Sequence, residues 1–131
     1  MQRAVVVVVI AFFCTIIAAC SPKITPEEAK VLVSLDEIQR GIESNIDYNR
    51  FVELLKTTKA EIVILKKNDH PNPCFVGAID KCYASYEIAR KAWKKKIESK
   101  DERRKADMEL TLSFSLSFAA LNIEKANNCY K

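Results

Sequence analysis

The stretch FVGAIDKCYASYEIARKAWKKKI, residues 75–97, decides how this chain folds. Its core-type side chains recur every three or four residues, at Phe75, Ile79, Cys82, Tyr86, Ala89, Trp93 and Ile97. This spacing places them on one face of an α-helix, which turns once in about 3.6 residues. Asn72 and Pro73 precede the stretch and suit the N-cap and first position of a helix. We therefore predict a long amphipathic helix that starts at Pro73 and buries this face.

Two further helices are predicted before residue 68. Thr25, Pro26 and Glu28 form a helix start, with Thr25 as N-cap and Glu28 completing a capping box. One apolar stripe predicts a helix that ends around Ser44 to Ile46, and a second predicts a helix from Tyr48 to about Lys67. The alternative is one long bent helix through both stripes. The stripes are Leu32, Leu35, Ile38, Ile42 and Ile46, then Tyr48, Phe51, Leu55, Ile62 and Leu65.

The stretch ELTLSFSLSF, residues 109–118, is compatible with two structures. Apolar and hydroxyl residues alternate in it, as in a half-buried strand. On a helical wheel its apolar residues and those that follow gather on two opposite sides, Leu110, Phe114, Phe118 and Leu121 on one and Leu112, Leu116, Ala120 and Ile123 on the other. The flanking segments favour helix, so we predict a helix that is apolar on both sides and lies in the centre of a bundle.

Four helices with short connections predict an all-α protein, an antiparallel up-down four-helix bundle over residues 26–131. The chain has two glycines, Gly41 and Gly77, which excludes glycine-rich phosphate loops and dinucleotide fingerprints. Its four prolines lie before the first helix and in the middle loop, so they leave two long proline-free stretches, as helical hairpins require.

The first twenty residues are of a different kind. Arg3 precedes an apolar run from Ala4 to Cys20. As a helix this run would reach roughly 26 Å, which is short of a hydrocarbon core of about 30 Å. A cationic start, an apolar middle and small residues at the end are typical of a secretory signal peptide. We predict export, with an uncleaved membrane anchor as the alternative.

The segment Ile17-Ala18-Ala19-Cys20 resembles the lipobox of bacterial lipoproteins. In that class the cysteine receives a diacylglycerol and becomes the first residue after cleavage. The resemblance implies a signal peptide over residues 1–19, a lipidated tether over 20–25, and a membrane partner held through the lipid on Cys20. Ser21 is not the aspartate linked to inner-membrane retention in that class, which implies an outer-membrane lipoprotein facing the periplasm. Cys14 follows two bulky phenylalanines and is predicted to be discarded with the signal.

Three cysteines remain in the bundle, Cys74, Cys82 and Cys129. In an exported protein they are disulfide candidates. If the last two helices are antiparallel, Cys74 lies opposite roughly residues 127–130 and Cys82 opposite roughly residues 119–122. Cys74 and Cys82 are about 12 Å apart along one helix, too far for a disulfide. We predict a Cys74–Cys129 bridge and a buried free thiol at Cys82.

No residue pattern predicts a catalytic residue. His70 is the only histidine, and it lies in a proline-rich loop without any of the common hydrolase motifs. His70, Cys74 and Cys82 could be grouped as metal ligands, but their spacing matches no short zinc pattern. We therefore predict no metal, no cofactor and no small-molecule substrate.

The stretch RKAWKKKIESKDERRK, residues 90–105, carries nine basic and three acidic residues. The basic residues are Arg90, Lys91, Lys94, Lys95, Lys96, Lys100, Arg103, Arg104 and Lys105. In an up-down bundle they form the tip farthest from the lipid, where they could bind an anionic cell-wall polymer, an acidic envelope protein or lipid phosphates. The alternative is a solvated turn that Glu43 and Asp47 partly neutralise. A net charge of +4 gives no support to nucleic-acid binding.

Together these features predict a lipid-anchored envelope protein that acts as a helical interaction or structural module facing the periplasm. The alternative function is an inhibitor or accessory component of an envelope enzyme or of a secretion or conjugation system. No motif in the bundle assigns a molecular activity.

Overall fold

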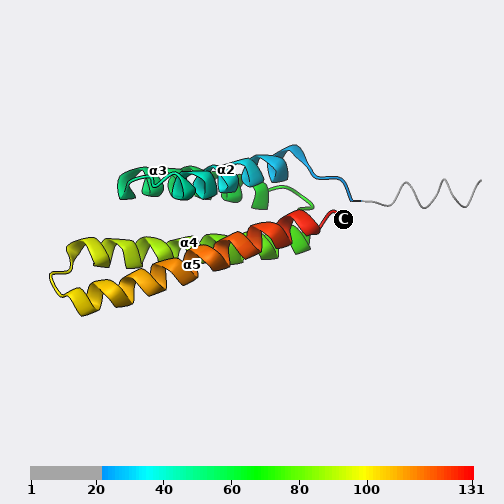
Figure 1. The fold of residues 1–131 in the computed structure, drawn as a ribbon. Coiled ribbons are helices and arrows are strands. Elements are labelled where there is room, and N and C mark those ends of the chain that lie inside the picture. Colours follow the sequence, from blue (N-terminus) through cyan, green and yellow to red (C-terminus); the bar gives the residue numbers. More distant parts are fainter. Residues whose placement is uncertain (1–21) are drawn as a thin grey trace, which may run out of the picture.

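The structure is a computed structural model that describes residues 22–131. Its four helices, joined by short connections, are α2 (Pro26–Glu43), α3 (Tyr48–Lys66), α4 (Pro73–Glu98) and α5 (Glu102–Asn128). Successive helices run in opposite directions, and the described part contains no strand (Figure 1). This confirms the predicted all-α four-helix bundle. The predicted signal peptide and Cys20 lie outside the described residues. Among the described helices, none has the length and hydrophobicity needed to cross a bilayer.

The helix starts follow the predicted capping chemistry. The Thr25 hydroxyl accepts a hydrogen bond from the Glu28 N–H at 3.2 Å, and the Glu28 carboxylate accepts one from the Thr25 N–H at 2.9 Å. Asp47 caps α3 in a similar way by accepting from the Arg50 N–H at 2.9 Å. Between α2 and α3, Asn45 has a positive φ of 55°, a conformation that ends a helix. The alternative of one long bent helix is therefore wrong.

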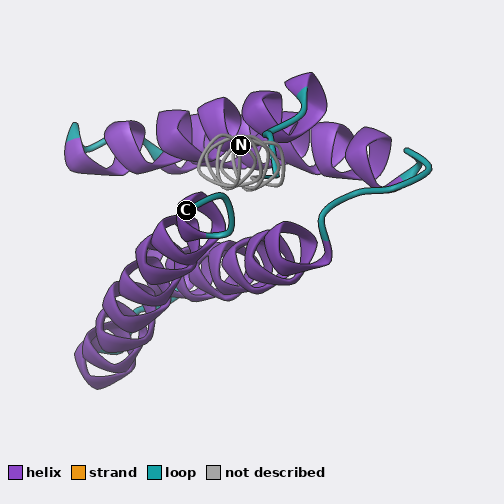
Figure 2. Ribbon diagram, turned by 90° about the vertical axis from the view of Figure 1, so that its right-hand side faces the viewer, coloured by secondary structure: helices purple, strands orange, loops and turns teal. Residues whose placement is uncertain are grey.

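The four helices form two hairpins that pack on each other. The α2–α3 hairpin lies over the α4–α5 hairpin, and the two cross at an angle (Figures 1 and 2). Phe51 of α3 packs between the hairpins, with its ring centre 6.1 Å from that of Tyr86 and 5.4 Å from that of Trp93 on α4. Phe51 and Tyr86 are fully buried, as an interhelical core requires.

Helices α4 and α5 are the most closely paired helices of the bundle. Their buried residues at heptad-like spacing are mostly small, namely Ala78, Cys82, Ser85, Ala89 and Ala92 on α4 and Leu112, Ser115, Ala119, Asn122 and Ala126 on α5. Small side chains let two helix backbones approach, and alternating spacings of three and four residues keep a seam on one face. This pairing makes the α4–α5 hairpin a rigid unit.

Helix α5 is exposed on one side, which differs from the prediction. The segment 109–118 is helical, as predicted. However, Leu110, Phe114, Phe118 and Leu121 are 60%, 73%, 55% and 44% exposed. The placement of α5 in the centre of the bundle is therefore wrong, because both α4 and α2 approach the other side of this helix.

Two smaller differences concern the core stripes. Ile97 was expected in the core but is 60% exposed, because the end of α4 extends beyond the α2–α3 hairpin (Figure 1). On α2, Leu35 and Ile38 are fully buried as predicted, but Val31 is also fully buried and its neighbour Leu32 is only half-buried. The stripe on α2 is thus rotated slightly from the one that the spacing suggested.

Candidate functional site

The strongest candidate site is the cationic tip, which we define as the nine basic residues of 90–105. It lies at the α4–α5 turn, at the opposite end of the bundle from the start of the described chain (Figure 1). The turn is held by its own hydrogen bonds. The Ser99 hydroxyl accepts from the Asp101 N–H at 3.2 Å, and the Asp101 carboxylate accepts from the Arg103 N–H at 3.0 Å. These two bonds hold the turn itself, whereas the start of the tip contacts α3 through Tyr48 and Trp93.

Four of the nine cations are neutralised within their own hairpin. The ion pairs are Arg90–Glu87 at 2.9 Å, Lys94–Glu98 at 3.8 Å, Lys105–Glu102 at 2.7 Å, and Lys96–Glu109. Hydrogen bonding to Glu87 raises the pKa of Arg90, so this guanidinium is already committed to a partner. These four side chains contribute little free charge at the tip.

Glu43 and Asp47, which the alternative of a solvated turn assigned to the tip, form no ion pair with it among residues 22–131. The reason is that the α4–α5 hairpin extends beyond the turn that carries Glu43 and Asp47. Glu43 accepts a hydrogen bond from Gln39 at 3.3 Å, and Asp47 serves as the N-cap of α3.

Five cations of the tip are exposed and have no ion-pair partner within the described residues, namely Lys91, Lys95, Lys100, Arg103 and Arg104. Lys95 and Arg104 line a hollow of about 310 Å³ between the two helices, together with Ser99, Met108 and Glu98, whose carboxylate is paired with Lys94. Lys91 and Lys95 are one helical turn apart, where like charges repel.

The sequence located this cluster but did not separate its free cations from the paired ones. Lys94–Glu98 and Lys105–Glu102 have the spacing of ion pairs within a helix, so these two pairs could have been predicted from the sequence. The pairing of Lys96 with Glu109 crosses from α4 to α5 and depends on the register of the hairpin. No sequence pattern marked Met108 as a residue of the hollow, because it lines the hollow only through its position beside the turn.

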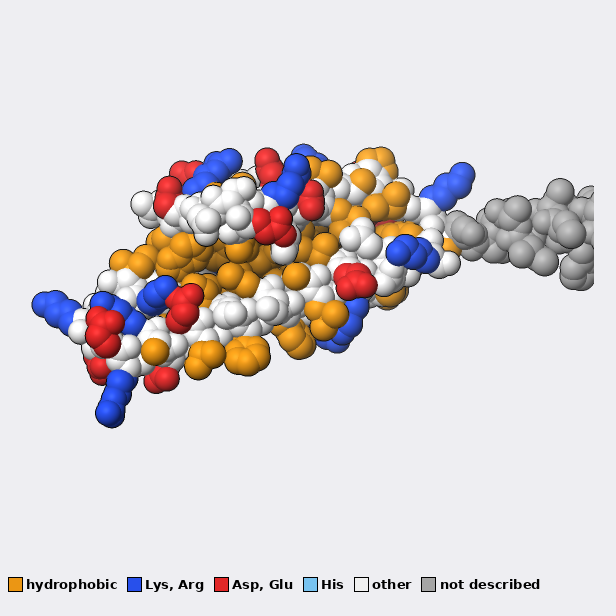
Figure 3. Space-filling view, viewed as in Figure 1, with side chains coloured by type: hydrophobic (Ala, Val, Ile, Leu, Met, Phe, Trp, Pro, Cys, Tyr) orange, Lys and Arg blue, Asp and Glu red, His pale blue; other side chains and the backbone are white. Residues whose placement is uncertain are grey.

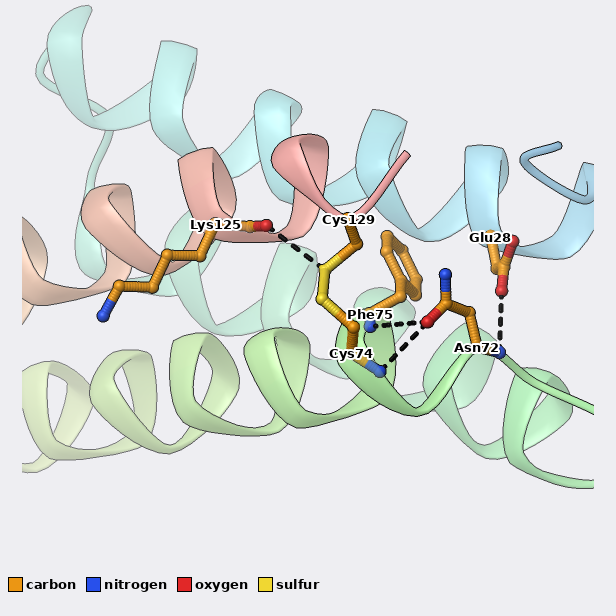
Figure 4. The surroundings of a disulfide bond; sticks show 6 residues. All are labelled: Glu28, Asn72, Cys74, Phe75, Lys125 and Cys129. Carbon is orange, nitrogen blue, oxygen red and sulfur yellow. Dashed lines mark hydrogen bonds between the residues drawn. A yellow bond between two sulfur atoms is a disulfide. The ribbon is translucent and has the colours of Figure 1, made fainter. Parts of the chain in front are cut away.

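At the opposite end of the bundle, a disulfide joins Cys74 to Cys129 (Figure 4). The two sulfurs are 2.01 Å apart and the α-carbons 5.9 Å apart. The bond links the first turn of α4 to the residue that follows α5, which is the pairing that the antiparallel register predicted. The Cys129 sulfur also lies 3.3 Å from the Lys125 carbonyl oxygen, but a disulfide sulfur has no hydrogen to donate.

Cys82 is a free, fully buried thiol. Burial raises its pKa to about 12, because the thiolate would lose its hydration. Cys82 is therefore uncharged near neutral pH and unsuited to act as a nucleophile or metal ligand.

The three residues considered as metal ligands are not brought together. Cys74 is bonded to Cys129 and Cys82 lies inside the bundle, so neither joins His70. His70 instead lines an open hollow of about 620 Å³ near Glu28 and Tyr130. Within residues 22–131, no group of three or more His, Cys, Asp or Glu side chains is placed to hold a metal ion.

The fold and the tip define a small disulfide-containing helical bundle with a cationic end. No family model matches the chain, and no match to it was found among the curated proteins or the solved structures.

Proposed function

We propose that this protein is a lipid-anchored envelope protein whose bundle is a helical interaction module facing the periplasm, and whose cationic tip binds an anionic partner. The observation that carries the proposal is the position of the five unpaired cations. They lie at the end opposite to Pro22, from which the chain runs toward the predicted lipid site at Cys20 (Figure 1). A tether at one end and a charged surface at the other suit a protein that links a membrane to something beside it.

The chemistry of the tip favours a partner with several anionic groups. Its free cations are solvated side chains on two helices and the turn between them, so each single contact with an anion is weak. A polymer or protein surface with repeated carboxylates or phosphates can engage several of them at once. Such binding weakens as salt rises, because exposed charges are screened within about 8 Å at physiological ionic strength. An outer-membrane protein facing the periplasm would meet anionic cell-wall polymer and acidic envelope proteins.

The lipid anchor is tested by metabolic labelling with palmitate. We expect the wild-type protein and Cys14→Ala to incorporate label and Cys20→Ala to lose it. Cys14→Ala is the matched control, because it removes the other cysteine of the apolar run. Equal labelling of the wild-type protein and Cys20→Ala would contradict the anchor. Labelled protein that fractionates with the inner membrane would contradict the outer-membrane location alone.

The tip is tested with two variants that remove the same amount of charge. Lys95→Gln/Arg104→Gln removes unpaired cations at the hollow, and Lys94→Gln/Lys96→Gln removes cations that already have partners. We expect the first variant to lose co-sedimentation with isolated cell-wall sacculi several-fold more than the second. Equal losses would assign binding to net charge rather than to the hollow, and no loss in either variant would contradict sacculus binding.

A photo-crosslinking residue at Lys100 tests the partner directly in cells. Lys100 is exposed in the three-residue turn between α4 and α5. We expect it to crosslink to an acidic envelope protein or to cell-wall fragments identified by mass spectrometry. The same residue placed at Lys59 on α3, which is also exposed, is the control for non-specific capture.

A further inference from the structure

The exposed side of α5 carries four large apolar residues, which we call the α5 stripe: Leu110, Phe114, Phe118 and Leu121. Their exposed fractions run from 44% to 73%. Spacings of four, four and three residues align them on one face of the helix. Figure 3 shows hydrophobic side chains along the outer edge of α5, on the side away from the α2–α3 hairpin. A continuous exposed stripe of this kind marks a surface that binds something.

The α5 stripe has an approximate internal symmetry. Phe114 pairs with Phe118 and Leu110 with Leu121 about a midpoint close to residue 116 of the chain. Beyond the stripe, Asp107 and Lys125 are placed about the same midpoint. They are 18 residues apart, or about five helical turns, so they have the same angular position on α5. The apolar residues are therefore placed almost symmetrically about the midpoint, while the charged residues at the two ends have opposite sign.

We propose that a second copy of this chain covers the α5 stripe in an antiparallel, two-fold symmetric pair of α5 helices. A two-fold axis that crosses the stripe at the level of residue 116 places Phe114 of each copy beside Phe118 of the other. It also places Asp107 of each copy beside Lys125 of the other. Within residues 22–131, both Asp107 and Lys125 are exposed and neither has an ion-pair partner. The dimer supplies both partners at once.

A parallel pair of α5 helices fits less well. It would place Asp107 against the same aspartate of the second copy, and Lys125 against the same lysine. Like charges opposed across an interface disfavour the wrong geometry. The antiparallel pair is thus the arrangement in which the ends of the stripe are complementary.

A membrane surface also fits less well as the occupant of the α5 stripe. Helices that lie on membranes carry lysine and arginine along their polar face. The stripe is instead flanked by the exposed hydroxyls of Ser113 and Ser117 and by the carboxylate of Glu124. Serine side chains let a second helix approach closely, whereas carboxylates oppose anionic lipid.

The pair is expected to be weak in dilute solution. A stable interface buries about 800 Å² on each partner, more than four side chains provide. Confinement of anchored copies to one membrane would raise their effective concentration. The dimer goes beyond the proposed function and needs neither the lipid nor the tip. In the antiparallel pair the two tips point in opposite directions, as do the two chain starts, so copies anchored to one membrane would hold the pair lengthwise along the membrane surface with both tips exposed.

Charge reversal tests the geometry. We expect Asp107→Lys and Lys125→Asp each to raise the dimer dissociation constant of the full chain about tenfold, because each replaces two attractions by two repulsions. The double variant Asp107→Lys/Lys125→Asp should return it to within about threefold of wild type, because its charges are complementary again. Sedimentation over a range of protein concentrations measures these constants. No rescue by the double variant, or a monomeric wild-type protein in this range and in membranes, would overturn the proposal.

Cysteine crosslinking tests the pair in isolated membranes. About the two-fold axis, residue 117 of the two copies is offset by about 3 Å along the helices and residue 113 by about 9 Å. We expect Ser117→Cys to form a dimer under mild oxidation and Ser113→Cys, the matched control, to form much less. The buried thiol of Cys82 should not compete. Equal crosslinking of the two variants would contradict the proposed axis.

Substitution of the two phenylalanines of the α5 stripe distinguishes a second copy of the chain from a membrane as the partner that covers the stripe. Phe114→Ser/Phe118→Ser changes exposed side chains only, so the thermal midpoint should stay near that of wild type. We expect this variant to lose dimers and to bind phosphatidylglycerol-containing vesicles as well as wild type does. A loss of vesicle binding without loss of dimers would overturn the proposal in favour of a membrane surface.

Discussion

The carboxylate of Glu28, in the first turn of α2, accepts a hydrogen bond of 3.1 Å from the backbone N–H of Asn72, the N-cap of α4, which lies 44 residues later in the chain. The same carboxylate accepts from the Thr25 N–H at 2.9 Å, and it is only 1% exposed. One side chain thus joins the starts of two helices, one from each hairpin. Figure 4 shows this contact beside the disulfide.

The acid stability of the protein should depend on Glu28. Burial alone would raise the pKa of Glu28, but the hydrogen bonds that its carboxylate accepts from the Thr25 N–H and the Asn72 N–H oppose this effect, and the pKa is lowered from its usual value. A carboxyl group with a lowered folded-state pKa stabilises the protein above its unfolded-state pKa. This stabilisation is lost as the pH falls through the folded-state pKa.

We therefore expect Glu28→Gln to lower the free energy of unfolding at pH 7 by about 1–3 kcal/mol, because an amide cannot accept both N–H groups. The deficit relative to wild type should shrink as the pH falls from about 5 to about 2. Denaturant unfolding at several pH values measures both effects. Glu27→Gln is the control, since Glu27 makes no hydrogen bond or ion pair in the described part of the chain, and a similar deficit there would contradict the role of Glu28.

Reduction should destabilise the bundle. The Cys74–Cys129 bond closes a loop with a sequence separation of 55 residues. By the chain-entropy model such a loop contributes about 4 kcal/mol. We expect Cys74→Ser/Cys129→Ser to lose a large part of this amount and to unfold identically with and without reductant. Thermal unfolding with and without a thiol measures the difference.

The control for this prediction is Cys82→Ala, which keeps the disulfide. It should still lose stability on reduction, as the wild-type protein does. Peptide mapping under non-reducing conditions should recover Cys74 joined to Cys129. A bridge that includes Cys82 would contradict the register of α4 against α5.

The sequence predicted those features of the fold that depend on neighbouring residues. Thr25 and Asn72 act over one helical turn, so their caps could be predicted directly from the sequence. The antiparallel hairpin follows from short loops, and its register predicted which cysteine lies opposite Cys74. The assignment of the helices therefore needed only local chemistry, and the cysteine pairing needed in addition only the lengths of the last two helices.

The features that were missed depend on how the two hairpins meet. An apolar stripe such as that of Leu110 and Phe114 indicates a face to be covered, but not whether the same chain covers it. The buried side chain of Glu28 joins the starts of two helices that are far apart in the sequence, and no local pattern marks such a contact. Likewise, Glu43 failed to neutralise the tip because α4 and α5 are longer than α2 and α3.

The close pairing of α4 and α5 should not tolerate a larger side chain in the seam. Ala89 is fully buried, whereas Ala84 on the same helix is exposed. We expect Ala89→Leu to lower the free energy of unfolding by about 1–3 kcal/mol through overpacking. Ala84→Leu should change the free energy of unfolding by no more than about 0.5 kcal/mol, since alanine and leucine have similar helix propensity. Equal effects of the two substitutions in chemical denaturation would contradict close packing at the seam.

The seam also holds a polar residue whose removal should raise stability. Asn122 is fully buried, and its side-chain amide donates to the Phe118 carbonyl at 2.8 Å. No donor among the described residues reaches its Oδ1 atom. Burying an acceptor without a partner costs about 1–3 kcal/mol, and Ala favours helix over Asn by roughly 0.6 kcal/mol. Part of this gain is offset because the smaller side chain packs less well at the seam. We therefore expect Asn122→Ala to raise the free energy of unfolding by about 1 kcal/mol in total.

A second asparagine on α5 provides the matched control for this substitution. Asn127 donates to the Ile123 carbonyl at 3.2 Å in the same i to i−4 arrangement, but it is exposed to solvent. Asn127→Ala should therefore gain only the helix propensity, at most about 0.6 kcal/mol. Denaturant unfolding of both variants isolates the cost of the buried carbonyl. If Asn122→Ala is destabilised while Asn127→Ala is not, the Asn122 amide has a structural role that outweighs that cost.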